Sequence, residues 1–380
     1  MSADSSRDAL AFVLFKYFPY GGLQRDFLRI AEACHRRGHS IRVYTLGWEG
    51  PVPDWVELSE MSVTGLTNPA RYRRFARAVA EDLARRPARC RIGFNKLPGL
   101  DVYYAADPCF EARARESRGP IYRLSSRYRT FAAFERAVFA PEAHTTVLVL
   151  TDRQRADFQR WYGTPSERFH RVPPGVARDR RAGPDAPAQR RALRGELGLD
   201  DDRLLLLFLG SGFVTKGLDR ALRAVAALPA GLRERVRLFV VGQDNPRRFR
   251  ALADRLGVAS RVAYSPGRDD VPRLLQGADL LIHPAYAETG GIVLLEAAVA
   301  GLPVIATAAC GFAPYIADAG AGIVLPEPFE QRRLDEALKM ALEEPGRRKA
   351  WSENGIAFGR TADIYDMPER VADLIEARLR

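Results

Sequence analysis

Short apolar runs alternate along the chain with longer segments in which apolar residues recur every three or four positions. The short runs have the composition of strands buried on both faces of a parallel sheet, and the longer segments have the period of amphipathic helices. The chain opens with a strand at 10–15, a helix at 23–36 and a second strand at 41–45. This order predicts the start of a doubly wound α/β domain, in which helices connect parallel strands.

The same pattern continues along the chain and predicts two α/β domains. The first half has a helix at 71–85 and strands at 91–94, 102–105 and 145–150. The second half has strands at 204–209, 238–241, 261–265 and 304–307, a helix at 246–256 and a last helix at 368–380. A segment rich in proline, alanine and arginine at 173–190 predicts a linker. We therefore expect an N-terminal domain at 1–172 and a C-terminal domain at 191–356.

The composition permits two domains and gives little sign of a membrane-spanning protein. The chain has 380 residues, of which 47% are hydrophobic, so each domain can bury a core. No apolar run approaches the length of a transmembrane helix, and the polar first residues lack a signal-peptide core, so we expect a cytoplasmic protein. The cysteines lie far apart in sequence, which favours reduced thiols over disulfides or a zinc site. They are Cys34, Cys90, Cys109 and Cys310.

The net charge of +11 is compatible with three kinds of partner: nucleic acid, an anionic membrane or a phosphorylated substrate. The segment 110–139 contains seven arginines against three glutamates, with aromatic residues between them. Basic and aromatic residues together on helices favour contact with an anionic membrane surface. The alternative is a core-facing helix with a solvated basic face.

The segment around Glu288 carries the strongest indication of chemistry. A strand-like run at 279–284 precedes it, and Gly290 and Gly291 follow it before an apolar helix that contains Glu296. A strand, a glycine turn and a helix N-terminus suit a diphosphate, because free backbone N–H groups and the helix dipole attract anions. A carboxylate beside that anion suits sugar hydroxyls, and Glu296 needs a partner in its apolar surroundings. The alternative is a helix-terminus acid and a solvated surface glutamate.

The glutamate pair and the residues after it resemble a known family. Two glutamates eight positions apart, followed by Ala297-Ala298-Val299-Ala300-Gly301-Leu302-Pro303-Val304, are similar to the signature of the retaining glycosyltransferases with the GT-B fold, of family 4. The strings at 15–26, 93–103, 122–129 and 283–286 resemble the lipopolysaccharide core glucosyltransferases of that class. The resemblance covers residues 10–375, nearly the whole chain.

The resemblance implies a GT-B fold, in which two Rossmann-like doubly wound domains face a central cleft and C-terminal helices at 357–380 cross back to the first domain. It implies a retaining, metal-independent transfer of glucose from UDP-glucose to a heptose of the lipopolysaccharide inner core, with an α-1,3 linkage, in outer core biosynthesis. UDP-glucose is then a co-substrate, and no resident cofactor is expected. Because the acceptor is a membrane lipid, we expect the enzyme at the cytoplasmic face of the inner membrane, bound through 110–139.

By resemblance, the donor site lies largely in the second domain. Glu296 would bind the ribose diol, and Glu288 would bind hexose hydroxyls beside the reacting carbon. The sugar and the diphosphate would be held by Thr289, Gly290, Gly291 and Ile292. Lys216 lies in a glycine-rich turn before a helix, where it would neutralise the departing diphosphate.

The sequence departs from the family pattern at one position. Many relatives carry an arginine five residues before the lysine, and Ser211 occupies that place here. Arg178 or Arg180, in the predicted linker, is the expected substitute. In the first domain, Gly21 and Gly22 would let the backbone approach the donor phosphate or sugar closely.

Four polar residues of the first domain are further candidates. Asp107 follows a strand and is expected to orient the donor sugar. Asp26, early in the helix after Gly22, is expected to bind the acceptor or to act as a base, with a helix-dipole acid as the alternative. Asn95 and Lys96 follow another strand and are expected to meet an anionic acceptor.

Two alternatives to a transferase stay open at this point. A sugar-nucleotide 2-epimerase of the same fold would interconvert UDP-sugars without a lipid acceptor. A basic nucleic-acid-binding protein would account for the charge, but the chain has no nucleic-acid-binding motif and the glutamate pair would have no role. No metal site is predicted, because the acidic run at 200–202 is typical of a turn before a strand.

Overall fold

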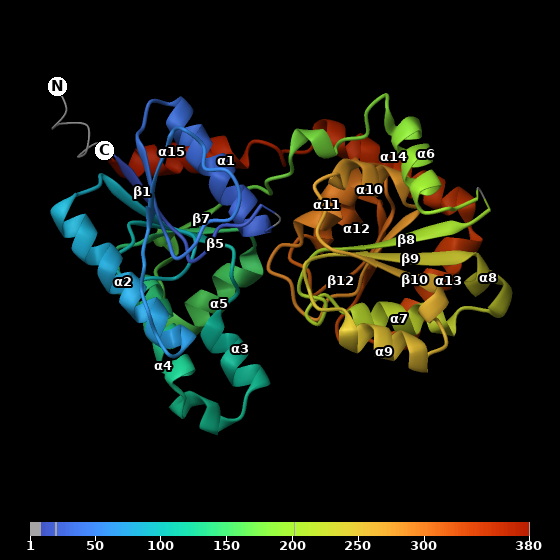
Figure 1. Ribbon diagram of the computed structural model, residues 1–380, viewed down its shortest axis with the longest axis horizontal. Helices are drawn as coiled ribbons and strands as arrows, with labels where there is room; N and C mark the ends of the chain where they lie inside the picture. The colour runs from blue at the N-terminus through green and yellow to red at the C-terminus, as the bar shows by residue number, and fades with distance from the viewer. Residues whose placement is uncertain (1–8, 20, 201, 380) are drawn as a thin grey trace. The chain divides into compact units, whose positions relative to one another are not determined.

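The computed structural model describes residues 9–19, 21–200 and 202–379. These residues form two compact units: unit 1 extends to Gly175 and includes the segment from Asp366 onward, and unit 2 runs from Val176 to Tyr365. Each unit has one parallel sheet with helices around it (Figure 1). The predicted fold class, two Rossmann-like doubly wound α/β structures, is therefore confirmed.

The described part of unit 1 has a seven-stranded parallel sheet in the order β3-β2-β1-β4-β5-β6-β7. Its strands are β1 (Leu10–Val13), β2 (Ile41–Thr45), β3 (Val56–Glu60), β4 (Cys90–Gly93), β5 (Val102–Ala105), β6 (Thr146–Val149) and β7 (Phe169–Arg171). The inner strands are buried on both faces, which explains their nearly continuous apolar sequences. The edge strands β3 and β7 are only partly buried and lack such a run, so the pattern did not reveal them.

The helices of unit 1 pack on both faces of this sheet. They are α1 (Gly22–Arg36), α2 (Asn68–Arg85), α3 (Phe110–Ser117), α4 (Ser126–Phe139), α5 (Asp152–Tyr162) and α15 (Met367–Leu379), with short 3₁₀ turns η1 (Pro120–Leu124) and η2 (Ser166–Arg168). Neighbouring residues of β1 point to opposite faces: Phe12 contacts Phe27 of α1, whereas Val13 joins the core that contains Phe75 of α2.

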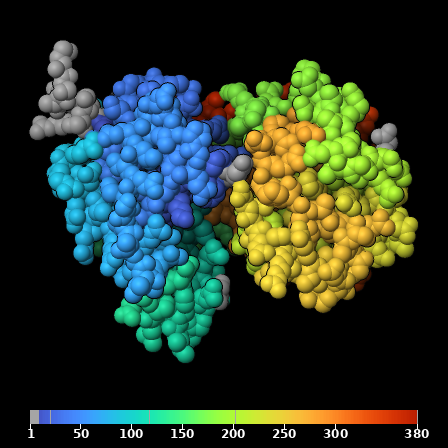
Figure 2. Space-filling view, viewed as in Figure 1, coloured from blue at the N-terminus to red at the C-terminus, as the bar shows by residue number. Residues whose placement is uncertain are grey.

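One part of unit 1 projects beyond its sheet. It consists of α3, η1 and α4, and we call it the lobe, residues 110–139 (Figure 1; teal in Figure 2). It is the segment that the sequence marked as basic and aromatic.

The described part of unit 2 has a six-stranded parallel sheet in the order β10-β9-β8-β11-β12-β13. Its strands are β8 (Leu204–Leu209), β9 (Val236–Val241), β10 (Val262–Ser265), β11 (Leu280–His283), β12 (Val304–Thr307) and β13 (Gly322–Leu325). Its helices are η3 (Arg178–Arg180), α6 (Ala186–Glu196), α7 (Leu218–Ala227), α8 (Ala230–Arg235), α9 (Arg247–Arg255), η4 (Ala259–Arg261), α10 (Val271–Gly277), α11 (Ile292–Val299), α12 (Ala313–Ala319), α13 (Gln331–Glu343) and α14 (Pro345–Thr361).

Each sheet has one point where the strand order reverses. It lies between β1 and β4 in unit 1 and between β8 and β11 in unit 2. Ligands of doubly wound sheets bind beyond the carboxyl ends of the strands at such a point. The loops after these four strands carry most of the predicted site residues.

The predicted linker 173–190 differs from the structure. Its end is helical, because α6 begins at Ala186, and Ala182 donates its N–H to the carbonyl oxygen of Val299 at 3.0 Å. Proline in the first turn of α6 is compatible with a helix, since those N–H groups have no partner within it. The proline-rich composition therefore concealed a helix start, and residues from Val176 onward belong to unit 2.

The C-terminal segment also differs from the expected 357–380. Helix α14 packs on α11 within unit 2, and the chain joins unit 1 only from Asp366. None of the described helices combines the length and the apolar content that crossing a bilayer requires.

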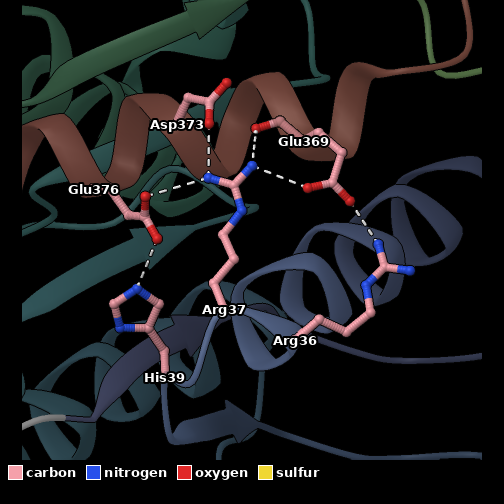
Figure 3. Close-up of polar contacts among 6 residues, drawn as sticks. All are labelled: Arg36, Arg37, His39, Glu369, Asp373 and Glu376. Atoms are coloured by element: carbon pink, nitrogen blue, oxygen red, sulfur yellow. Dashed lines mark hydrogen bonds and ion pairs between the residues drawn. The ribbon is translucent and has the colours of Figure 1, made fainter.

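A network of charged side chains attaches α15 to the end of α1 (Figure 3). It joins Arg36, Arg37 and His39 to Glu369, Asp373 and Glu376. Arg37 is its centre, because its guanidinium donates to Asp373 at 2.7 Å and to both the carboxylate and the carbonyl oxygen of Glu369, at 2.9 and 3.0 Å. The network therefore ties the last helix to unit 1.

We expect Arg37→Ala to lower the free energy of unfolding by about 1–2 kcal/mol, because several charge-assisted hydrogen bonds are lost from a largely shielded guanidinium. Arg36→Ala is the matched control: its side chain is 60% exposed, and it should change the value by less than about 0.5 kcal/mol. Urea unfolding measures both, and equal losses in the two variants would contradict the central role of Arg37.

Candidate active site

In unit 2 the loop after β8 carries Lys216 and packs closely on the chain beyond β11. Gly210, Gly212 and Gly217 adopt positive φ values of 123°, 82° and 75°, which favour glycine. A Cβ on Gly217 would also overlap the carbonyl oxygen of Pro284. These glycines therefore let the loop place Lys216 over the carboxyl end of β11.

The loop after β11 carries Glu288 and leads into α11. The N–H of Glu288 donates to Ala309 at 3.2 Å, and its carbonyl oxygen accepts from Gly311 at 3.1 Å. Gly291 has a φ of 86° and precedes α11, whose first turn has no side-chain cap. Uncapped N–H groups at a helix N-terminus attract an anion, so this end of α11 suits a phosphate group.

Thr289 and Gly290, which precede Gly291 in this loop, were predicted to hold the sugar and the diphosphate together with it. Gly290 accepts from the N–H of Phe312 at 2.8 Å, and a Cβ on Gly290 would crowd the Phe312 ring. Ile292 is the first residue of α11. Thr289, Gly290 and Ile292 are therefore close in the chain to the N-terminus of α11, where a ligand would bind.

The carboxylate of Glu288 lies beside two other ionisable side chains. Its Oε2 forms an ion pair with the ammonium of Lys216, and it lies 3.6 Å from Nε2 of His283, which is fully buried at the end of β11. Burial raises the pKa of Glu288, but the neighbouring His283 and Lys216 outweigh it and lower this pKa to about 2. Burial lowers the pKa of His283, so its imidazole is neutral near pH 7.

Glu296, on α11, is buried, with 4% of its surface exposed, and has the partner that its apolar surroundings require. Arg180 donates to its Oε1 at 3.3 Å and to Asp179 at 3.0 Å. Arg178 instead lies over the ring of Tyr365, 5.1 Å from its centroid. Arg180, one of the two arginines predicted to replace the one absent at Ser211, is therefore in contact with a candidate site residue.

In unit 1, the end of β1 leads through Gly21 into α1. A Cβ on Gly21 would overlap the side chain of Gln24, whereas a Cβ on Gly22 would meet nothing within 4 Å. Asp26 lies in the second turn of α1, and its Oδ2 accepts from the hydroxyl of the buried Tyr104 at 2.8 Å. A side chain at Gly21 would thus force Gln24 and Phe18 to move, and Gly22 leaves open space at the start of the helix.

The structure gives Lys96 a partner within unit 1. Its ammonium donates to Glu135 at 2.6 Å and to the carbonyl oxygen of Pro108 at 2.7 Å. Glu135 is fully buried on α4 and also accepts from the N–H groups of Phe110 and Glu111, at 2.7 and 2.9 Å, at the start of α3. Lys96 thus neutralises a buried carboxylate, which the sequence did not indicate because Glu135 lies far along the chain.

A cavity of about 340 Å³ lies beyond the carboxyl ends of β4 and β5 in unit 1. It is lined by Phe15, Asn95, Lys96, Asp107, Pro108, Phe110, Arg113, Ala114, Arg118, Tyr122, Arg127 and Phe131. Asn95 also accepts from the N–H of Phe15 at 2.7 Å, and Asp107 is exposed. In the described part of the chain, none of Arg113, Arg118 and Arg127 forms an ion pair with a carboxylate, so the cavity has an excess of positive charge.

Metal-binding clusters were sought among the described residues. These contain no group of three or more histidine, cysteine or acidic side chains that could hold a metal ion. The acidic run at 200–202 was predicted to be a turn, and Asp201 lies outside the described residues.

Two Rossmann-like sheets, with a lysine loop and a glutamate loop at the switch point of the second, define a GT-B glycosyltransferase. Residues 189–358 match the family model described as Glycosyl transferases group 1. Over 370 residues the chain is 50% identical to the lipopolysaccharide glucosyltransferase WaaG of Escherichia coli (strain K12), which covers 97% of this chain and 99% of that protein. The crystal structure of WaaG has a TM-score of 0.94, with 96% and 99% of the two chains covered. The chain therefore belongs to the WaaG family of group 1 glycosyltransferases.

More distant relatives share the class or the fold. D-inositol 3-phosphate glycosyltransferase 2 of Catenulispora acidiphila is 32% identical over 261 residues, 63% of this chain and 59% of that protein. HepE of Anabaena, in complex with UDP-glucose, has a TM-score of 0.73 at 18% identity, covers 97% of this chain and 99% of its own, and shows the fold alone. The predicted enzyme class is confirmed, and these relatives do not support the epimerase or the nucleic-acid-binding alternative.

We expect Lys216→Met to weaken the dependence of stability on acid pH. Because the pKa of Glu288 is lower folded than unfolded, its contribution to stability is complete above its ordinary value of about 4.5 and is lost as pH falls toward 2. Without Lys216 the folded pKa rises toward the unfolded value, so the variant is less stable than wild type near pH 6 but loses less stability than wild type as pH falls to 3. Unfolding by urea between pH 3 and 6 measures this, and Lys349→Met, which removes a lysine that is 79% exposed, should leave the profile unchanged. Identical profiles for wild type and Lys216→Met would contradict the pairing.

Proposed function

We propose that the protein is a retaining glucosyltransferase that moves glucose from UDP-glucose to a heptose of the lipopolysaccharide inner core, with an α-1,3 linkage. The observation that carries this proposal is the 50% identity to a lipopolysaccharide glucosyltransferase over nearly the whole of both chains. The arrangement around Glu288 in unit 2 fits the chemistry that this reaction requires.

The proposed reaction develops positive charge on the sugar and negative charge on the departing diphosphate. The N-terminus of α11 and the ammonium of Lys216 offer positive potential for the diphosphate. The carboxylate of Glu288 then binds hydroxyls of the glucosyl group and stabilises its positive charge. Because Lys216 and the helix supply the compensation, we propose that no metal takes part and that no cofactor is required.

Before the donor binds, Lys216 is paired with Glu288. A diphosphate at α11 would compete for the ammonium, because it carries more negative charge than one carboxylate. Glu296 would receive the ribose diol, with Arg180 holding its carboxylate in place. We also propose that Thr289, Gly290, Gly291 and Ile292 contact the sugar and diphosphate.

Unit 1 would bind the acceptor. Its cavity presents three arginines that suit carboxylate or phosphate groups, next to aromatic rings that suit sugar faces. Asn95 and Asp107 line the same cavity and offer hydrogen bonds to hydroxyls. Asp26, oriented by Tyr104, remains the candidate for an acceptor-binding group or a base.

We propose that the lobe contacts the inner membrane from its cytoplasmic side. Most aromatic side chains of the lobe pack against one another, as Phe110 does on Tyr128 and Phe131. Two aliphatic residues of η1 are exposed instead, Ile121 at 80% and Leu124 at 72%. Apolar side chains surrounded by arginines at a projecting tip suit insertion among anionic lipid headgroups.

We expect Glu288→Gln to lower kcat for glucose transfer by about 10²-fold or more, because a charge that acts on the transition state is removed. The assay uses labelled UDP-glucose and heptose-terminated inner-core lipopolysaccharide, with a chelator present. Glu353→Gln, at an exposed position of α14, should retain wild-type activity. If the wild type transfers no sugar from UDP-glucose, UDP-galactose or UDP-N-acetylglucosamine, the donor and acceptor assignment is wrong.

We expect the double variant Ile121→Ser, Leu124→Ser to bind vesicles of anionic lipid about tenfold more weakly than wild type, because two inserted aliphatic side chains are lost. Val52→Ser, at a position outside the lobe that is 40% exposed, is the control. Co-sedimentation at low and high salt separates apolar insertion from charge attraction. Unchanged binding by the double variant would exclude η1 as the point of insertion.

A further inference from the structure

His283 is a buried imidazole whose ring nitrogens have no hydrogen-bond partner among the described residues. It ends β11, its exposed fraction is 0%, and neither Nδ1 nor Nε2 is hydrogen-bonded within the described part of the chain. Its ring lies against Phe208, with centroids 6.3 Å apart. Burying an imidazole without hydrogen bonds is unfavourable, and an apolar side chain would fill the same place without that penalty.

The geometry around Nε2 indicates a use for this imidazole. Nε2 lies 3.6 Å from Oε2 of the Glu288 carboxylate. Three titratable groups face Glu288 from three elements: Lys216 from the loop after β8, His283 from β11, and Cys310 from the loop after β12. Burial raises the pKa of Cys310 to about 12, so its thiol stays protonated and supplies no charge.

The need for His283 arises when Lys216 leaves Glu288. Under the proposed function, the donor diphosphate takes the ammonium, and Glu288 stays in its shielded place without that cation. Burial then favours the protonated carboxyl group, which would donate to the sugar hydroxyls instead of accepting from them. Apart from the weakly donating thiol of Cys310, a neutral imidazole with its proton on Nε2 is the remaining side-chain donor among the described groups that face this carboxylate.

We propose that His283 is a positioning residue that acts through Glu288: its Nε2–H holds the carboxylate ionised and oriented while Lys216 is bound to the donor diphosphate. This inference rests on the proposed function, since it concerns the donor-bound state. It assigns the tautomer with the proton on Nε2 and leaves Nδ1 as an unpaired acceptor.

Two substitutions separate the hydrogen bond from the packing. His283→Gln keeps an N–H donor near the position of Nε2, and His283→Leu removes it. Phe208→Leu is the matched control, because it disturbs the ring packed on His283 without touching its polar atoms. We expect His283→Leu to lower kcat 10- to 100-fold with a donor KM within about threefold of wild type, and to move the acid limb of the kcat profile to higher pH. His283→Gln and Phe208→Leu should keep the wild-type acid limb.

A ¹⁵N NMR spectrum of the imidazoles tests the same inference without turnover. The chain has five histidines, so the signal of His283 is identified by its loss in His283→Gln. We expect the Nε2–H tautomer in the wild type and a mixture of tautomers in Glu288→Ala. If the wild type transfers no sugar, the proposed function fails, and the tautomer alone decides the role of His283. A proton on Nδ1, or a loss of activity in His283→Gln equal to that in His283→Leu, would overturn the inference.

Discussion

Glu288 has to keep its negative charge where burial works against it, and the active loops of unit 2 are arranged around that requirement. A carboxylate loses hydration when it is shielded, and it stays ionised only if nearby donors or cations replace the lost water. Lys216 and His283 provide this replacement from two different strands. Their combined effect exceeds that of burial, since the pKa of Glu288 lies at about 2.

The parallel sheet makes this meeting possible. Lys216 follows β8 and Glu288 follows β11, and these strands are neighbours in space although some 70 residues separate the two loops (Figure 1). The reversal of strand order at this point separates the helices that follow the two strands and leaves their loops facing each other. Gly217 permits the close approach, because any side chain there would strike the backbone of Pro284. Gly217 is thus required by packing, independently of any part in ligand binding.

The sequence predicted those features that depend on local pattern. Inner strands such as β8 and β11 were found because burial on both faces demands continuous apolar residues. The edge strands β3 and β7 were not predicted, because they are half-exposed and lack a continuous apolar run. The start of α6 was not predicted, because its prolines suggested a linker. Pairings across long separations could not be read from the chain. Glu135, the partner of Lys96, lies 39 residues away from it, and the contact of Arg180 with Glu296 spans 116 residues.

Glu135 links the cavity of unit 1 to the lobe. Its carboxylate accepts from two N–H groups at the start of α3 and from Tyr162 of α5 at 2.7 Å, while Lys96 balances its charge. Buried charge of this kind fixes geometry more than it adds stability, because the cost of removing the ions from water offsets most of their attraction. Here it sets where α3 begins, and α3 both lines the cavity and carries the chain toward the exposed tip of η1. The acceptor is proposed to be a membrane lipid. The cavity that receives its sugars and the surface that contacts the membrane therefore have to keep a fixed distance and orientation. Glu135 fixes this arrangement, because one buried carboxylate joins α3 to α4, α5 and the end of β4.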